Sequence, residues 1–110
     1  MVSVTQFIAE IVGTTIFMLA IVDLAFADAN KAAANSGSIA LYIGLGLTIS
    51  IYITAGLGGY GHLNPIASVV CSANGAINAG DCAALIVAQI IGGLLAFILY
   101  FAMGGKRAVV

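Results

Sequence analysis

The chain has 110 residues, of which 63% are hydrophobic and only 6% are charged, and its formal net charge is −1. A water-soluble domain carries roughly 25% charged residues, so this composition excludes a soluble globular protein and predicts an integral, multi-pass membrane protein surrounded by the lipid bilayer. The sequence has no basic patch, which excludes nucleic acid as a partner.

The first apolar segment runs from about residue 4 to 26, and about 20 residues suffice to cross a ~30 Å hydrocarbon core. Glu10 lies inside this segment, and an ionisable residue within the membrane is a candidate functional residue. Ala9 and Gly13 are small residues four positions apart, which would let another helix approach closely. No Lys or Arg precedes the segment, so we expect no cleaved signal peptide.

The second predicted span covers about residues 37–56, and a glycine-rich stretch follows it. Asn64 is expected to cap a short helix, with Pro65 in the first helical position. This helix, over residues 64–73, would be ~15 Å long, which is half of the ~30 Å hydrocarbon core. The pattern predicts a re-entrant half-helix that begins near mid-membrane, where non-helical backbone is tolerated only inside protein or beside a water-filled cavity.

The third predicted span covers about residues 82–103, with Asp81 as its expected N-cap. Small residues recur at Ala84, Ala88 and Gly92, and would allow close helix packing. The two cysteines, Cys71 and Cys82, are expected to be buried. The chain has one His, and we find no nucleophile–base pair, carboxylate cluster or metal-ligand spacing. We therefore predict one all-α membrane domain over 1–110 with no catalytic residue, metal or cofactor.

The segment His62-Leu63-Asn64-Pro65 resembles the first Asn-Pro-Ala loop of the aquaporin, or major intrinsic protein, family. Ala9-Glu10 with Gly13-Thr14 is similar to the first helix of that family, and Ala88-Gln89 with Gly92-Gly93 to its third. Because family members carry six spans and two half-helices, this chain resembles one repeat. The resemblance implies a half-aquaporin fold completed by an antiparallel second copy, with four pores built from eight chains.

The resemblance further implies a passive channel for water and glycerol-like neutral solutes. Two Asn64 amides would donate to the passing solute where two half-helices meet, and the positive helix ends, roughly half a charge each, would repel cations. Backbone carbonyls of Gly59, Gly61 and His62 would line the vestibule. The other pore candidates are Pro65, Ile66, Ala67, Gly44 and Leu45. By resemblance, Glu10 and Gln89 brace the loop, while His62 either braces it or touches the solute.

Two departures from the family pattern bear on selectivity. Ile66 replaces a small Ala and should reshape the constriction between the half-helices. Ala67 stands where the second family repeat carries Arg, and the aromatic filter position falls at Gly44 or Leu45. We therefore expect a wider, less discriminating pore. Four apolar residues are predicted to lie in an apolar pore wall or in the core, and the spacing alone favours the core: Ile66, Leu45, Val69 and Val70.

Several alternatives remain open. Lys31, Lys106 and Arg107 would fall on one side of the membrane, and this bias opposes insertion in both orientations. An inverted partner protein could therefore replace the second copy. The chain could also be a small dual-topology, proton-coupled exporter that uses Glu10, although residues 57–80 are too rich in Gly and Asn for a fourth span. A third possibility is a non-conducting accessory subunit.

Overall fold

A computed structural model of the chain describes residues 1–25 and 36–104, and within them the only regular secondary structure is α-helix. The helices are α1 (Val4–Ala25), α3 (Ser36–Gly56), α4 (Pro65–Ala73) and α5 (Ala79–Ala102). Of these, α1, α3 and α5 are long and apolar enough to cross a membrane. The predicted all-α class, with three spans and one short helix, is confirmed.

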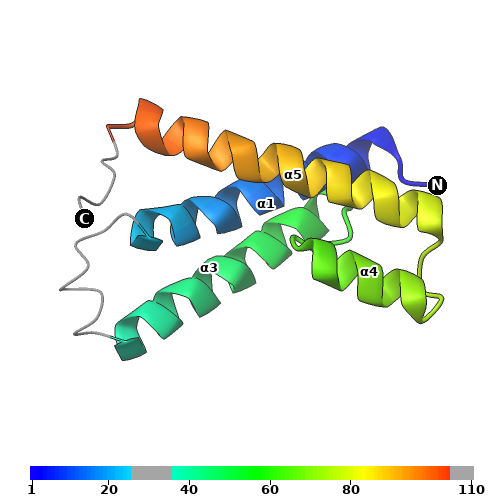
Figure 1. Cartoon of the computed structure of the whole chain (residues 1–110), viewed down its shortest axis with the longest axis horizontal. Helices are drawn as coiled ribbons and strands as arrows, with labels where there is room; N and C mark the ends of the chain where they lie inside the picture. The colour runs from blue at the N-terminus through cyan, green and yellow to red at the C-terminus, as the bar shows by residue number, and fades with distance from the viewer. Residues whose placement is uncertain (26–35, 105–110) are drawn as a thin grey trace.

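The helices form a bundle around α1, which contacts both α3 and α5. Figure 1 shows α1 and α5 running in the same direction along the long axis, while α3 runs the opposite way. The short helix α4 packs against α5 and occupies only the half of the bundle that holds the N-terminus. A half-length helix therefore starts inside the bundle rather than at its end.

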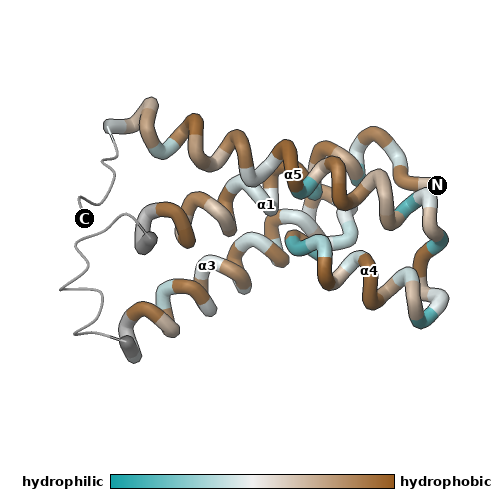
Figure 2. Tube along the Cα trace, in the orientation of Figure 1, coloured by the Kyte–Doolittle hydropathy of each residue, from teal (hydrophilic) through white to brown (hydrophobic). Residues whose placement is uncertain are grey.

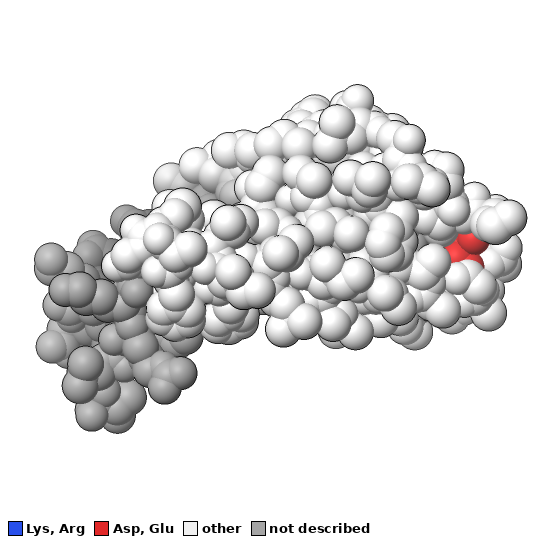
Figure 3. Space-filling view, turned by 90° about the horizontal axis from the view of Figure 1, so that it is seen from above, with Lys and Arg blue, Asp and Glu red and all other residues white. Residues whose placement is uncertain are grey.

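The surface of the bundle suits a lipid environment. Figure 2 shows apolar residues along α1, α3 and α5, and hydrophilic ones at the loop before α4, about half-way along the bundle. On the face seen in Figure 3, one small acidic patch near one end is the only Asp or Glu surface of the described residues, and none of their surface there is Lys or Arg. Lys31, Lys106 and Arg107 lie outside the described residues, so their predicted placement has no structural counterpart here.

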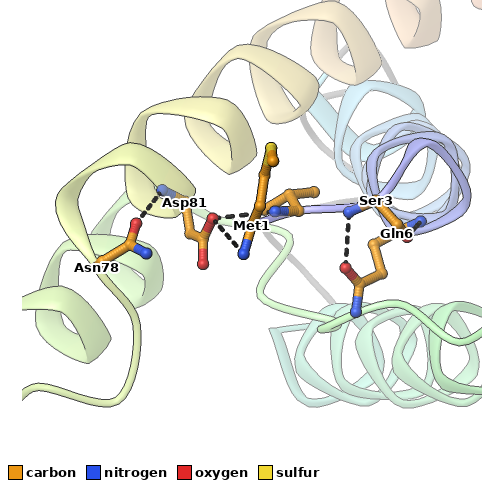
Figure 4. A network of polar contacts seen from close by, with 6 residues as sticks. Met1, Ser3, Gln6, Asn78 and Asp81 are labelled. Atoms are coloured by element: carbon orange, nitrogen blue, oxygen red, sulfur yellow. Dashed lines mark hydrogen bonds and ion pairs between the residues drawn. The ribbon is translucent and has the colours of Figure 1, made fainter.

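The start of α5 differs from the prediction. Asn78, not Asp81, is the N-cap, and its Oδ1 accepts the backbone N–H of Asp81 at 2.7 Å. Asp81 lies in the first turn, where its Oδ1 accepts the N–H of Val2 at 3.0 Å and lies 3.6 Å from the N-terminal ammonium group (Figure 4). The helix thus begins three residues earlier than expected. The Asp81 side chain holds residues 1 and 2 against the first turn of α5.

Small residues set the distance between α1 and α5. A Cβ atom on Gly92 would lie 2.8 Å from the Thr14 Cβ and 2.9 Å from the backbone oxygen of Ile11. Ala88, one turn earlier, is fully buried. A Cβ on the neighbouring Gly93 would meet nothing within 4 Å. The two adjacent glycines therefore form a matched pair for testing this packing.

We expect Gly92→Ala to lower the free energy of unfolding by about 1–3 kcal/mol, because the added methyl group overpacks the contact with α1. Gly93→Ala should be neutral or stabilising by up to ~1 kcal/mol, since Ala is the better helix former. Detergent unfolding followed by circular dichroism measures both. Equal stability of the two variants would show that α1 and α5 are not in the close contact described.

The cysteine prediction is half right. Cys82 is buried, as expected, whereas Cys71 on α4 is only partly buried. The difference arises because α5 packs along α1, while α4 has a single packed side. Both cysteines are free thiols.

Candidate functional site

The backbone between α3 and α4 is held in left-handed conformations. Gly58 and Gly61 have φ angles of +82° and +72°, which glycine adopts at little cost. Leu63 also has a positive φ, of 60°, which residues other than glycine rarely adopt, and it is 2% exposed. A Cβ on Gly59 would lie 2.7 Å from the Cβ of Ala9, so the loop passes directly against α1. The glycines thus permit a tight re-entrant path inside the bundle.

Glu10 on α1 is fully buried and anchors this loop. Its Oε2 accepts the backbone N–H of Gly61 at 3.1 Å, and its Oε1 accepts the N–H of Leu63 at 2.5 Å. Gln89 on α5 donates from Nε2 to the same Oε1 at 3.0 Å. Hydrogen bonds to an ionised carboxylate are about twice as strong as neutral ones. The carboxylate therefore satisfies two loop N–H groups that have no helical partner.

Ser68 connects Gln89, and through it Glu10, to α4. Its Oγ accepts from Gln89 Nε2 at 2.9 Å and lies 3.0 Å from Nδ1 of His62. The side chain of Ser68 is fully buried, and it links the loop, α4 and α5 in one chain of hydrogen bonds. Tyr60 packs beside His62 with ring centroids 5.5 Å apart. Sequence reasoning did not single out Ser68, although it lies one helical turn after Asn64.

Asn64 ends the loop and begins α4. It has extended φ and ψ angles of −147° and 129°, and its Oδ1 accepts the N–H of Ile66 at 2.9 Å. Pro65 occupies the first helical position, as the sequence predicts. Asn64 is exposed on the chain, and its amide nitrogen makes no hydrogen bond to a described residue. The helix cap thus presents amide donors outward from the middle of the bundle.

The chain matches the model of the family described as "Major intrinsic protein" over residues 1–109. It belongs to the major intrinsic protein family. Glycerol uptake facilitator protein-like 6 of Lactiplantibacillus plantarum is 38% identical over 91 residues, which are 83% of this chain and 40% of that protein. The chain therefore spans less than half the length of this curated relative. No solved structure matches it.

The predicted aquaporin resemblance and the integral membrane location are thereby confirmed. Members of the major intrinsic protein family are channels rather than enzymes, which supports the interpretation of this chain as a non-enzyme. The family assignment also favours a channel over the alternative of a proton-coupled exporter. In this structure Glu10 is 0% exposed and accepts three hydrogen bonds, two from the loop and one from Gln89, so its side chain holds the loop in place.

Four apolar site residues, predicted to lie in a pore wall or in the core, are not buried in the single chain. Ile66, Val69, Val70 and Leu45 are 71%, 51%, 55% and 52% exposed. In α4 the cause is helical geometry, because the helix turns Ser68 inward and so directs the 66, 69 and 70 positions outward. In this major intrinsic protein, the apolar face of α4 is therefore uncovered.

The remaining pore candidates fall into two groups. Gly59, Gly61, His62 and Ala67 are partly buried around the start of α4. Gly44 and Leu45 are exposed on the first half of α3, which Figure 1 shows at the end of the bundle away from α4. The structure thus gathers the loop residues around Asn64 and leaves the two expected filter positions apart from them.

Proposed function

We propose that the chain forms a passive channel for water and small neutral solutes such as glycerol, with the pore between two antiparallel copies. The observation that carries the proposal is the half-helix α4, which starts inside the bundle with Asn64 exposed at its N-terminus. An unsatisfied polar group in hydrocarbon costs several kcal/mol. The start of α4 therefore needs either a second chain or water beside it, and a water-filled pore between two chains provides both.

The proposed mechanism follows from the chemistry of this helix end. The Asn64 amide donates to a hydroxyl or water oxygen, while the loop carbonyls of Gly59 to His62 accept from its hydrogens. The N-terminus of α4 carries roughly half a positive charge, and two such ends facing each other repel cations. Glu10 and Gln89 hold the loop in place, so that the donors and acceptors stay in a fixed arrangement.

The proposed range of solutes rests on the side chains at the filter positions. A Cβ on Gly44 would meet nothing within 4 Å, and Ala67 carries only a methyl group. Neither these two residues nor Leu45, the other candidate for the aromatic position, carries an aromatic ring or a charge as the family's filter residues do. The matched relative is called a glycerol uptake facilitator-like protein, which supports a solute larger than water.

Stopped-flow light scattering of liposomes with and without the purified chain tests the proposal. We expect both water and glycerol gradients to relax faster in the protein-containing liposomes, and to do so equally with or without a pH gradient. No acceleration over empty liposomes would reject channel activity and leave a non-conducting accessory subunit. Flux that requires the pH gradient would instead indicate the proton-coupled exporter.

A further inference from the structure

Tyr60 is the only Phe, Trp or Tyr in the loop and short helix that residues 57–73 form. It lies four residues before Asn64 and is 38% exposed on the chain. The expected filter positions, Gly44, Leu45 and Ala67, carry no ring. Any limit on the size of a solute therefore has to come from another part of the proposed pore, and Tyr60 offers the one bulky ring close in sequence to Asn64.

Hydrogen bonds fix the backbone on both sides of Tyr60. The N–H of Gly59 donates to the backbone oxygen of Thr54 at 2.9 Å. The N–H of Gly61 donates to Oε2 of Glu10 at 3.1 Å. No described peptide bond is cis, so the carbonyl of Tyr60 points opposite to the N–H of Gly61 and away from Glu10. Tyr60 thus has a fixed position on the open side of the loop.

The ring of Tyr60 lies beside a second ring that is itself held in place. Its centroid is 5.5 Å from that of His62, and Nδ1 of His62 lies 3.0 Å from Oγ of Ser68. This Oγ already accepts from Gln89, so its own hydrogen goes to Nδ1. The reverse arrangement would leave a buried hydroxyl hydrogen without a partner, which is costly. The neutral imidazole therefore carries its hydrogen on Nε2.

Three polar groups of this loop have no hydrogen-bond partner among the described residues: the Tyr60 hydroxyl, Nε2–H of His62 and the amide nitrogen of Asn64. Figure 2 shows this hydrophilic loop about half-way along the bundle. Unsatisfied polar groups are strongly disfavoured in hydrocarbon, and lipid-facing tyrosines prefer the level of the headgroups to the bilayer centre. This surface of the loop therefore faces water rather than acyl chains.

We propose that the Tyr60 ring sets the upper size limit of the channel, so that glycerol passes and longer neutral polyols are excluded. The inference rests on the proposed channel and assigns its selectivity to a residue outside the expected filter positions. A tyrosine side chain turns about only two bonds, and here its backbone and the neighbouring ring restrict it further. Because an antiparallel pair is two-fold symmetric, a solute passes one Tyr60 ring in each half of the pore.

Tyr60→Ala should raise the permeability to ribitol, a longer polyol than glycerol, severalfold and leave water permeability little changed. The substitution removes the ring but keeps Asn64 and the hydrogen bonds that anchor the loop. Tyr60→Phe keeps the ring and should exclude ribitol as the wild type does. Phe97→Ala is the control, because it removes a ring that is 41% exposed on α5, and it should change neither permeability. Stopped-flow light scattering of liposomes in water, glycerol and ribitol gradients measures all four proteins.

The outcomes separate this inference from the proposed function. If Tyr60→Ala passes water but still excludes ribitol, the ring does not set the limit, and the channel stands without it. A wild type that passes ribitol as readily as glycerol also overturns the inference alone. Wild-type liposomes that relax no faster than empty ones reject the channel, and the size limit with it.

Cysteine labelling tests the same ring without relying on the folding of Tyr60→Ala. In a Cys71→Ser, Cys82→Ala background, Tyr60→Cys should react faster than Phe97→Cys with a small anionic methanethiosulfonate, which does not enter hydrocarbon. Labelling Tyr60→Cys with the benzyl reagent restores a ring at this position and should again exclude ribitol. Equal reaction rates at the two positions, or ribitol flux that the benzyl group leaves unchanged, would overturn the inference.

Discussion

Glu10→Leu should lower the free energy of unfolding by about 3 kcal/mol or more and abolish permeation. The substitution removes the acceptor for the N–H groups of Gly61 and Leu63 and for the Gln89 amide. Each buried donor left without a partner costs about 1–3 kcal/mol. The loop would leave α1, and Asn64 would lose its position at the start of α4. Unfolding in detergent and stopped-flow permeability measure the two effects.

Thr5→Leu is the matched control, because Thr5 is exposed on the same helix and should change stability by less than about 0.5 kcal/mol. Glu10→Gln keeps one acceptor oxygen and should give an intermediate loss of stability. If Glu10→Leu proves as stable as Thr5→Leu, the carboxylate does not anchor the loop. If a destabilised Glu10→Gln variant still conducts, the carboxylate braces the loop and takes no direct part in transport.

Asn64→Asp should keep the fold and impair the channel. An Asp carboxylate can cap α4 in the same way, by accepting the N–H of Ile66. The substitution removes the amide donor of each of the two copies. Each lost hydrogen bond to the solute should raise the free-energy barrier to permeation by ~1 kcal/mol, so we expect water flux to slow by roughly tenfold or more. The added negative charge also cancels the positive field of the helix ends, so we expect cations to pass where the wild type excludes them.

Asn74→Asp makes the same change of charge at the C-terminal end of α4, where the Asn74 side chain accepts the N–H of Ala76 in an exposed turn. It should leave water flux and cation exclusion unaltered. Stopped-flow water permeability and a cation-sensitive dye in the same liposomes give both readouts. If Asn64→Asp behaves like Asn74→Asp, Asn64 is only a helix cap.

The features that depend on local chemistry were predictable from the sequence. Asn64 and Pro65 specify a helix start through a side-chain cap and a missing N–H, and both effects need only neighbouring residues. The start of α5 was misplaced because Asn78 and Asp81 are equally good capping residues. The backbone decides between them: Asn78 has extended φ and ψ angles of −83° and 169°, which a cap requires, whereas Asp81 is already helical.

The features that depend on tertiary contacts were harder to predict from the sequence. The role of Ser68 depends on α5, which brings Gln89 within hydrogen-bonding distance of its Oγ. The residue spacing within α4 does not predict that contact. Apolar spacing on α4 and α3 also could not show whether Ile66 and Leu45 face a core, lipid or another chain. In a membrane protein, residues in all three environments are apolar. Apolar periodicity therefore does not identify the core-facing side of a helix, as it does in a soluble protein.

We infer that α4 stops partway through the bilayer and is completed by an inverted copy. An electron-microscopy map of the purified chain in lipid nanodiscs tests it most directly. We expect neighbouring copies in opposite orientations, with the N-termini of two α4 helices meeting at mid-membrane. A map in which all copies are parallel, or in which α4 lies among the lipid headgroups, would contradict it.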